Sequence, residues 1–193
     1  MIKLAYFTPD DFPLLINWIS DEDLLMNWAG TQFKYPLTAE KLNWYLRDAN
    51  NFEDSSTLIY KAVDTESNQM VGHVSLTAVN RVNRSARITR VFVGPAERGR
   101  GIGEQITKAV LEIGFNLLKL HRMSLGVFDF NQPAIRCYKK CGFRVDGILR
   151  DINKHGNEYW SMMEMSVLEN EWQEMQDVST GETFLHNLIR LAR

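Results

Sequence analysis

The sequence predicts an α+β fold in a single domain. Its 193 residues are 45% hydrophobic and 24% charged, the composition of a globular domain that can bury a sizeable core. Short strands with alternating hydrophobicity follow one another in the middle of the chain, and helices and strands alternate after them. No Pro- or Ser-rich linker divides the chain. The predicted order of elements is βαα-βββ-α-β-α-ββ-α.

The first part of the chain is predicted to contain one strand and two helices. Residues 2–7 are short and rich in apolar side chains, as in a strand. Thr8 can cap the helix that follows, and Pro9 suits the first turn of that helix. Thr38 opens the second helix. The segment between them, residues 21–33, is predicted to be a loop or a broken helix.

The middle of the chain is predicted to be a meander of antiparallel strands. Residues 57–63, 70–79 and 85–93 each read as a strand, and polar turns separate them. Because these turns are short, consecutive strands are expected to pair with one another.

The second half is predicted to alternate helices with strands and to end in a hairpin. Apolar residues recur at helical spacing over 102–117, and Gly142 suits the end of a short helix. We assign residues 1–175 to the domain and residues 176–193 to a C-terminal helical extension, whose apolar face could serve a homodimer interface. The predicted elements are a helix over 102–117, a strand over 122–128, a helix over 133–140, hairpin strands over 144–151 and 158–168, and a terminal helix over 180–193.

Charge and hydropathy exclude several functional classes. The net charge is −2 and the pI is about 6.1, so a broadly basic surface for nucleic acid is not indicated. No apolar run approaches the roughly 20 residues of a membrane span. The N-terminus is too short and too acidic for a signal peptide. We therefore expect a cytoplasmic protein with no nucleic-acid or membrane partner.

The cysteines and histidines do not form a metal-binding pattern. Cys137 and Cys141 are four residues apart, and the four histidines are scattered along the chain. We therefore expect no metal site and two reduced thiols. No arrangement of His and an acidic residue is visible that would activate either thiol as a nucleophile.

A Gly-rich, basic loop between a strand and a helix carries the clearest chemical signal. Three glycines within five residues let the backbone approach a ligand closely, and the free N–H groups at a helix start favour phosphate. The dinucleotide motif G-x-G-x-x-G fails because Glu104 occupies its last position, and the P-loop motif fails because no Lys-Ser or Lys-Thr pair follows. The loop reads Arg98-Gly99-Arg100-Gly101-Ile102-Gly103.

Two motifs resemble those of the GNAT superfamily of N-acetyltransferases. The loop matches the coenzyme A motif R-x-x-G-x-G, and residues 131–143 match N-x-x-A-x-x-x-Y-x-x-x-G-F. Residues 147–150 and 160–172 look like the branch that includes ribosomal-protein alanine acetyltransferases and spermidine acetyltransferases. The resemblance implies a mixed, centrally splayed sheet of six to seven strands with flanking helices, plus a C-terminal helix. It also implies acetyl-CoA as co-substrate and an amine as acceptor, which is a protein N-terminus, a polyamine or another small molecule.

The resemblance also implies which residues hold the co-substrate. The main chain of residues 91–93 would pair with the pantetheine arm like an added strand. The loop would bind the pyrophosphate. Asn131 would hold the co-substrate, although its position also suits a helix N-cap. The implied binding residues are Val91, Phe92, Val93, Arg98, Gly99, Arg100, Gly101, Ile102, Gly103 and Asn131.

Tyr138 is the candidate general acid, because a phenol placed at the sulfur can protonate or hydrogen-bond the departing thiolate. Asp129 and Glu164 are the candidate general bases, and an ordinary surface charge is the alternative for each. Aromatic side chains could line the acceptor pocket, although such residues more often belong to a core. The candidates are Trp18, Trp28, Phe33, Tyr159 and Trp160.

The resemblance implies direct transfer through a ternary complex, without a covalent acyl-enzyme. Two alternatives remain open at this point. One is a noncatalytic regulatory module that binds acyl-CoA without turnover. The other is a nucleotide-binding protein that uses the same loop.

Overall fold

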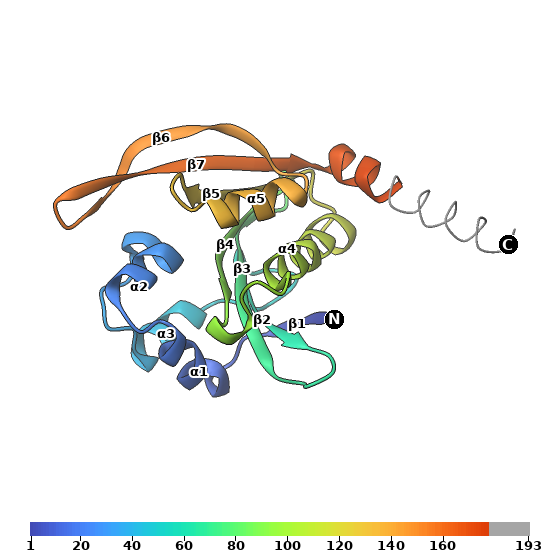
Figure 1. The fold of residues 1–193 in the computed structure, drawn as a ribbon. Helices are drawn as coiled ribbons and strands as arrows, with labels where there is room; N and C mark the ends of the chain where they lie inside the picture. Colours follow the sequence, from blue (N-terminus) through green and yellow to red (C-terminus); the bar gives the residue numbers. More distant parts are fainter. Residues whose placement is uncertain (178–193) are drawn as a thin grey trace, which may run out of the picture.

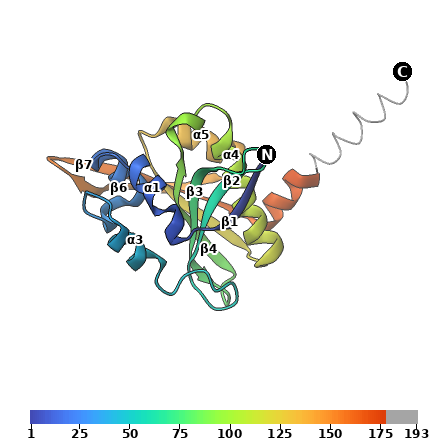
Figure 2. The same cartoon turned by 90° about the horizontal axis from the view of Figure 1, so that it is seen from below.

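The computed structural model describes residues 1–177, which form one seven-stranded sheet with helices on both faces (Figures 1 and 2). The strand order is β1-β2-β3-β4-β5-β7-β6. Neighbouring strands are antiparallel except β4 and β5, which are parallel. The predicted α+β fold is thereby confirmed. The strands are β1 (Ile2–Tyr6), β2 (Leu58–Asp64), β3 (Met70–Asn80), β4 (Ser85–Val93), β5 (Arg122–Phe128), β6 (Arg144–His155) and β7 (Glu158–Leu168).

The helices lie in two groups, one on each face of the sheet (Figure 2). Residues 169–177 form a further helix. This helix includes the predicted boundary between the domain (residues 1–175) and the C-terminal extension (residues 176–193). Within residues 1–177, no helix is both long and apolar enough to cross a bilayer. The helices are α1 (Phe12–Trp18), α2 (Glu22–Ala29), α3 (Ala39–Leu46), α4 (Ile102–Glu112), which continues into a π-helical turn (Ile113–Leu117), and α5 (Gln132–Lys140).

Two elements differ from the sequence prediction, and a third predicted element lies outside the residues that the structure describes. Helix α2 occupies the segment predicted as a loop or broken helix, because the Asp21 side chain accepts a hydrogen bond from the Leu24 N–H at 2.8 Å and caps it. Strand β6 runs four residues past the predicted end at residue 151, up to the turn at Gly156. The predicted terminal helix over 180–193 lies outside the described residues.

Two buried layers hold the helices to the sheet. Helices α1–α3 pack on one face through side chains such as Leu15 and Leu42, and Phe92 of β4 belongs to the same layer. Helices α4 and α5 pack on the other face through Ile106 and Ile135. Because both faces are covered, the long strands β2 and β3 are buried along most of their length.

The sheet splays in its middle, between β4 and β5. These strands pair over four residues only, Ser85–Ile88 with Arg122–Leu125. Beyond Ile88, β4 stays paired with β3 as far as Val93, while β5 stays paired with β7. One edge of β4 therefore faces a gap from Thr89 onwards, which confirms the predicted splayed sheet.

A β-bulge lies in β4 where the splay begins. Between the pairs Ser75–Thr89 and His73–Phe92, β4 has one residue more than β3. Arg90 takes up this extra length with a φ of +54°, a conformation rare for a non-glycine residue. The main-chain oxygen of Arg90 accepts two hydrogen bonds of 3.0 Å, one from Trp28 Nε1–H and one from His73 Nδ1–H.

His73 is fully buried under this bulge. Burial lowers the pKa of His73 to about 4, so the ring is neutral at pH 7. The neutral ring donates from Nδ1, and its Nε2 has no hydrogen-bond partner among the described residues. The bulge is thus held by a histidine that folding keeps uncharged.

Stability is expected to fall in mild acid because of His73. Its pKa is about 4 in the folded protein and 6.5 when unperturbed, so the unfolded chain binds the proton more readily between these values. The contribution is fully present above pH 6.5 and decreases as the pH falls to 4, by up to about 3 kcal/mol of unfolding free energy. Urea titrations of wild type and His73→Asn across this range measure the effect.

His73→Asn is the matched variant, because the Asn amide can still donate to the Arg90 oxygen but does not titrate. The variant starts less stable, since it fills less of the core, but its stability should change less between pH 6.5 and 4. Parallel curves for the two proteins would show that His73 does not carry this pH dependence.

Candidate active site

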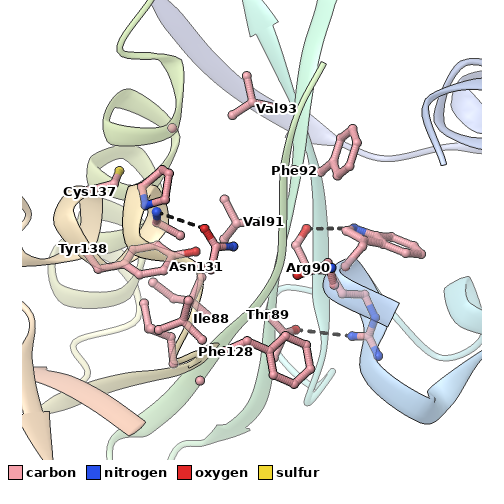
Figure 3. A pocket seen from close by; sticks show the side chains of 18 of the residues that line it. Ile88, Thr89, Arg90, Val91, Phe92, Val93, Phe128, Asn131, Cys137 and Tyr138 are labelled. Atoms are coloured by element: carbon pink, nitrogen blue, oxygen red, sulfur yellow. Dashed lines mark hydrogen bonds between the residues drawn. The ribbon is translucent and has the colours of Figure 1, made fainter. Parts of the chain in front are cut away.

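The gap beside β4 opens into a cavity of about 900 Å³. Residues 88–93 of β4 form one wall, α5 forms the opposite wall, and the loop before α4 closes one end (Figure 3). Leu24 and Asn27 of α2 reach the other end. The hairpin of β6 and β7 extends over α2, where His155 Nε2 lies 2.7 Å from Asp23 Oδ1 (Figure 1).

The loop before α4 presents main-chain N–H groups to the cavity. Gly99 and Gly101 have φ values of +79° and +74°, which favour glycine. The helical hydrogen bond nearest the start of α4 runs from Gln105 N–H to the Gly101 oxygen at 3.2 Å. The N–H groups of Ile102, Gly103 and Glu104 therefore have no partner within the helix. Together with the helix dipole, they fit the phosphates of an anionic ligand.

The two arginines of this loop differ in position. Arg98 lines the cavity, and its guanidinium carbon lies 5.5 Å from the centre of the Phe92 ring. Arg100 points elsewhere: it forms an ion pair with Glu97 and does not line the cavity. The role predicted for Arg100 in binding the pyrophosphate stays a prediction from the sequence. Arg98 is the arginine of the pair available for phosphate.

Helix α5 places two polar side chains opposite β4. Asn131 caps the helix, since its Oδ1 accepts the Ala134 N–H at 3.2 Å, and its amide nitrogen stays free to donate. Tyr138 is buried, and burial raises its pKa well above the usual range. Among the described residues its hydroxyl has no hydrogen-bond partner, and Figure 3 shows the ring directed toward β4. Tyr138 is thus a protonated donor facing the cavity.

The cavity also borders a thiol. Cys137 lines it, while Cys141 is fully buried behind it. No His lines this cavity among the described residues, so no imidazole activates Cys137 as a nucleophile. Within residues 1–177, no three His, Cys, Asp or Glu side chains gather as a metal site would require.

Comparison with protein families identifies the family of this chain. Residues 17–143 match the family described as "Acetyltransferase (GNAT) family". The chain belongs to the acetyltransferase (GNAT) family. It is an acetyl-CoA-dependent acetyltransferase that acetylates an amine. The splayed sheet, the Gly-rich loop and the tyrosine of α5 are the family features that the sequence predicted.

Its relatives act on different amines. The chain is 25% identical over 151 residues to spermidine N(1)-acetyltransferase of Escherichia coli (strain K12), covering 74% of this chain and 80% of that protein. It is 31% identical over 91 residues to an L-amino acid N-acetyltransferase of the same strain, covering 47% and 56%. A structure of the Vibrio cholerae spermidine N-acetyltransferase with CoA and spermine has the same fold, with a TM-score of 0.77 and 20% identity over 89% of this chain and 98% of that one.

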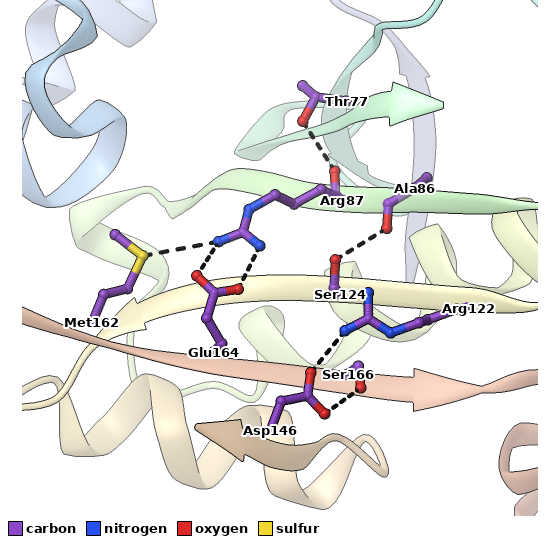
Figure 4. A network of polar contacts seen from close by, with 9 residues as sticks. All are labelled: Thr77, Ala86, Arg87, Arg122, Ser124, Asp146, Met162, Glu164 and Ser166. Carbon is purple, nitrogen blue, oxygen red and sulfur yellow. Dashed lines mark hydrogen bonds and ion pairs between the residues drawn. The ribbon is translucent and has the colours of Figure 1, made fainter. Parts of the chain in front are cut away.

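Neither predicted general base of this acetyltransferase lines the cavity. Both Glu164 carboxylate oxygens accept hydrogen bonds from Arg87, at 2.6 and 2.7 Å (Figure 4). Gly126 makes room for this pair, because a Cβ there would lie 2.4 Å from Arg87 Nη2 and 3.1 Å from Glu164 Oε1. Asp129 lies at the end of β5 outside the cavity, and its main chain bonds to Ser161 and Gln132. Both base assignments stay predictions from the sequence.

The predicted aromatic pocket is mostly core or surface. Trp28 does line the cavity, where its indole N–H holds the Arg90 oxygen. Phe33 is buried and stacks on Trp28 at 6.0 Å between ring centres, so it belongs to the core. Tyr159 lies exposed on the outer hairpin, outside the cavity. Trp18 stacks on Phe92, and Trp160 packs on Phe128; neither lines the cavity.

Sequence reasoning missed several residues of the cavity wall, including two at the bulge. Thr89 and Arg90 line it at the bulge, and both also line a second cavity beside α3. The sequence offers a weak signal for Arg90, namely a charged residue within an otherwise apolar strand end. The bulge that directs its side chain has no sequence signature here.

Acetyl-CoA binding is expected to depend on Arg98 more than on Arg100. Arg98→Ala removes a charged donor from the cavity and should weaken binding about 10-fold or more, the usual scale for a charge-assisted hydrogen bond. Arg100→Ala removes a cation that pairs with Glu97 and should weaken binding less than about threefold. Isothermal titration calorimetry with both variants measures this. Equal losses would show that both arginines reach the phosphates.

Glu164 is expected to act on stability. Glu164→Gln leaves the partly buried Arg87 without its carboxylate and should lower the unfolding free energy by about 1–2 kcal/mol. The double variant Arg87→Gln/Glu164→Gln should recover part of that loss, as a double-mutant cycle in urea would show. If Glu164 instead served as the base, the single variant would lose turnover at unchanged stability.

Proposed function

We propose that the domain transfers the acetyl group by direct attack of a primary amine on acetyl-CoA in a ternary complex. The observation that supports this proposal is the composition of the cleft. One cavity brings together the unpaired edge of β4, the N–H groups before α4 and the Tyr138 hydroxyl. The reaction needs these three elements, one for each part of the thioester co-substrate.

The co-substrate fits the cleft from its phosphates to its sulfur. The free N–H groups of Ile102–Glu104 and the Arg98 guanidinium would hold the pyrophosphate. The edge of β4 that faces the gap at Val91–Val93 would pair with the amides of the pantetheine arm, as it would with a strand. This arrangement directs the thioester into the splay between β4 and α5.

The transfer forms one bond and breaks one. The neutral amine nitrogen attacks the thioester carbonyl carbon, a C–N bond forms, and the C–S bond breaks to give an amide and the coenzyme A thiolate. The nitrogen loses its extra proton to water, and the thiolate acquires a proton. No acyl-enzyme is required, since the amine attacks the thioester directly and no His lines the cavity to activate Cys137.

Tyr138 stabilises the departing sulfur. A thiol has an unperturbed pKa of about 8.5, and burial raises the pKa of the phenol far above that. Full proton transfer to the thiolate is therefore uphill, and the main contribution of Tyr138 is a hydrogen bond that strengthens as charge develops. Water then completes the protonation.

No enzyme carboxylate is assigned as the base. Glu97 and Glu104 line the cavity, but they lie at the phosphate loop and pair with Arg100 and Lys108. We infer that the amine loses its proton to solvent before it attacks. The homodimer, the cytoplasmic location and the role of residues 176–193 stay predictions from the sequence.

Replacing Tyr138 by Phe tests the mechanism. Loss of the hydroxyl should lower kcat about 100-fold, the usual scale for one acid or oxyanion donor, while the rise in Tm with acetyl-CoA stays the same. Thiol release with a panel of amines measures turnover, and mass spectrometry identifies the acetylated product. Unchanged turnover would remove Tyr138 from the mechanism. If wild type binds acetyl-CoA but releases no thiol with any amine, the noncatalytic module is the correct function.

A further inference from the structure

Arg90 is a cation held beside the cleft without a counter-charge. Its guanidinium carbon lies 4.8 Å from the centre of the Tyr45 ring and 6.0 Å from that of Phe33. Its Nη1 lies 3.3 Å from Thr89 Oγ1. Cation–π contacts hold the position of the group, but they do not neutralise it.

The other arginine of β4, Arg87, does have a carboxylate partner. Arg87 is paired with Glu164, whereas no carboxylate among the described residues lies within 4.0 Å of Arg90. Arg90 Nε is buried and has no hydrogen-bond partner among the same residues. A buried N–H without an acceptor is costly. The side chain therefore keeps a charge that no carboxylate among the described residues neutralises.

A second cavity, of about 570 Å³, lies against Arg90 on the α3 side of β4. Thr89 and Arg90 line both this cavity and the co-substrate cleft, so the two spaces adjoin at the bulge. The other charged groups along it are Arg47 and Asp48, both exposed. With two cations and one carboxylate, the second cavity favours an anionic guest.

This charge pattern does not suit a polyamine. A polyamine carries several positive charges and needs unpaired carboxylates along its path. The carboxylates of the co-substrate cleft are paired with Arg100 and Lys108, and the cation nearest the point where the cavities meet is Arg90. An acceptor with several ammonium groups would meet repulsion at that point.

We propose that the acceptor is an amine that also carries a carboxylate, as an amino acid does, and that Arg90 is the residue that selects it. The guanidinium, which no carboxylate among the described residues pairs with, receives the carboxylate of the acceptor. Arg90 precedes the main chain of Val91, which we assign to the pantetheine arm. A carboxylate at Arg90 therefore leaves the amine of the same molecule near the thioester. This rests on the proposed acetyl transfer.

Matched acceptor pairs test the inference on the full-length enzyme. Each pair is an amino acid and the amine that lacks only its carboxylate, for example phenylalanine with phenethylamine and lysine with cadaverine, and spermidine is added as a polyamine. Thiol release from acetyl-CoA gives kcat/KM. The carboxylated member of at least one pair should be preferred about 10- to 100-fold, the range of one charge-assisted contact.

Variants assign the preference to Arg90. Arg90→Met should abolish it, and Arg90→Lys should retain part of it, because lysine keeps the charge but loses the planar fork. Arg122→Met is the control, since Arg122 pairs with Asp146 away from both cavities, and it should keep the full preference. A rise in Tm with acetyl-CoA confirms that each variant is folded and binds the co-substrate.

The outcomes are distinct. Equal or better acetylation of the descarboxy amines or of spermidine by wild type overturns the inference and leaves the proposed function intact. A preference that survives in Arg90→Met also overturns it. Absence of thiol release with every amine overturns the proposed function, and the inference falls with it.

Discussion

The main-chain oxygen of Arg90 organises the site, because two buried donors fix it where the sheet splays. Trp28 comes from α2 and His73 from β3, so the two bonds tie a helix and a strand to the bulge of β4. Neither donor has another acceptor among the described residues. If the bulge straightened and moved this oxygen away, two buried N–H groups would lose their acceptor. The free-energy cost of two unsatisfied buried donors is larger than the stabilisation from one ordinary hydrogen bond. The bulge is therefore strongly specified.

The bulge also decides which side chains face the co-substrate. Strand alternation would place Ile88, Arg90 and Phe92 on one face of the sheet. The extra residue changes this: Ile88, Val91 and Val93 pack with α4 and α5, whereas Phe92 packs with α1–α3. Arg90 moves to the side of Tyr45 and α3. The wall facing Tyr138 thus becomes apolar, and the cation reaches the neighbouring cavity.

The bulge shows which parts of the site can be predicted from the sequence and which cannot. The glycines, the cap at Asn131 and Tyr138 are local features, so the loop, α5 and its tyrosine could be predicted from residue types and spacing. The bulge depends on donors from residues far along the chain, and Arg90 has no local property that requires a positive φ. The pairing of Arg87 with Glu164 needs β4, β5 and β7 side by side, and Gly126 between them. These long-range contacts are why the sequence could predict the fold but not the surroundings of the candidate base and pocket residues.

The same arrangement keeps two anion sites apart along one strand. Arg98 and the N–H groups before α4 lie past the end of β4, with Arg98 over the Phe92 ring, while Arg90 lies at the bulge, over the rings of Tyr45 and Phe33. A single cationic pocket would let the carboxylate of an acceptor compete with the phosphates of the co-substrate. Because the two cations lie at different points along β4, each anion of the proposed reaction would have its own partner. In the proposed transfer, the reacting amine and the thioester would meet between the two cations, at the unpaired edge of β4.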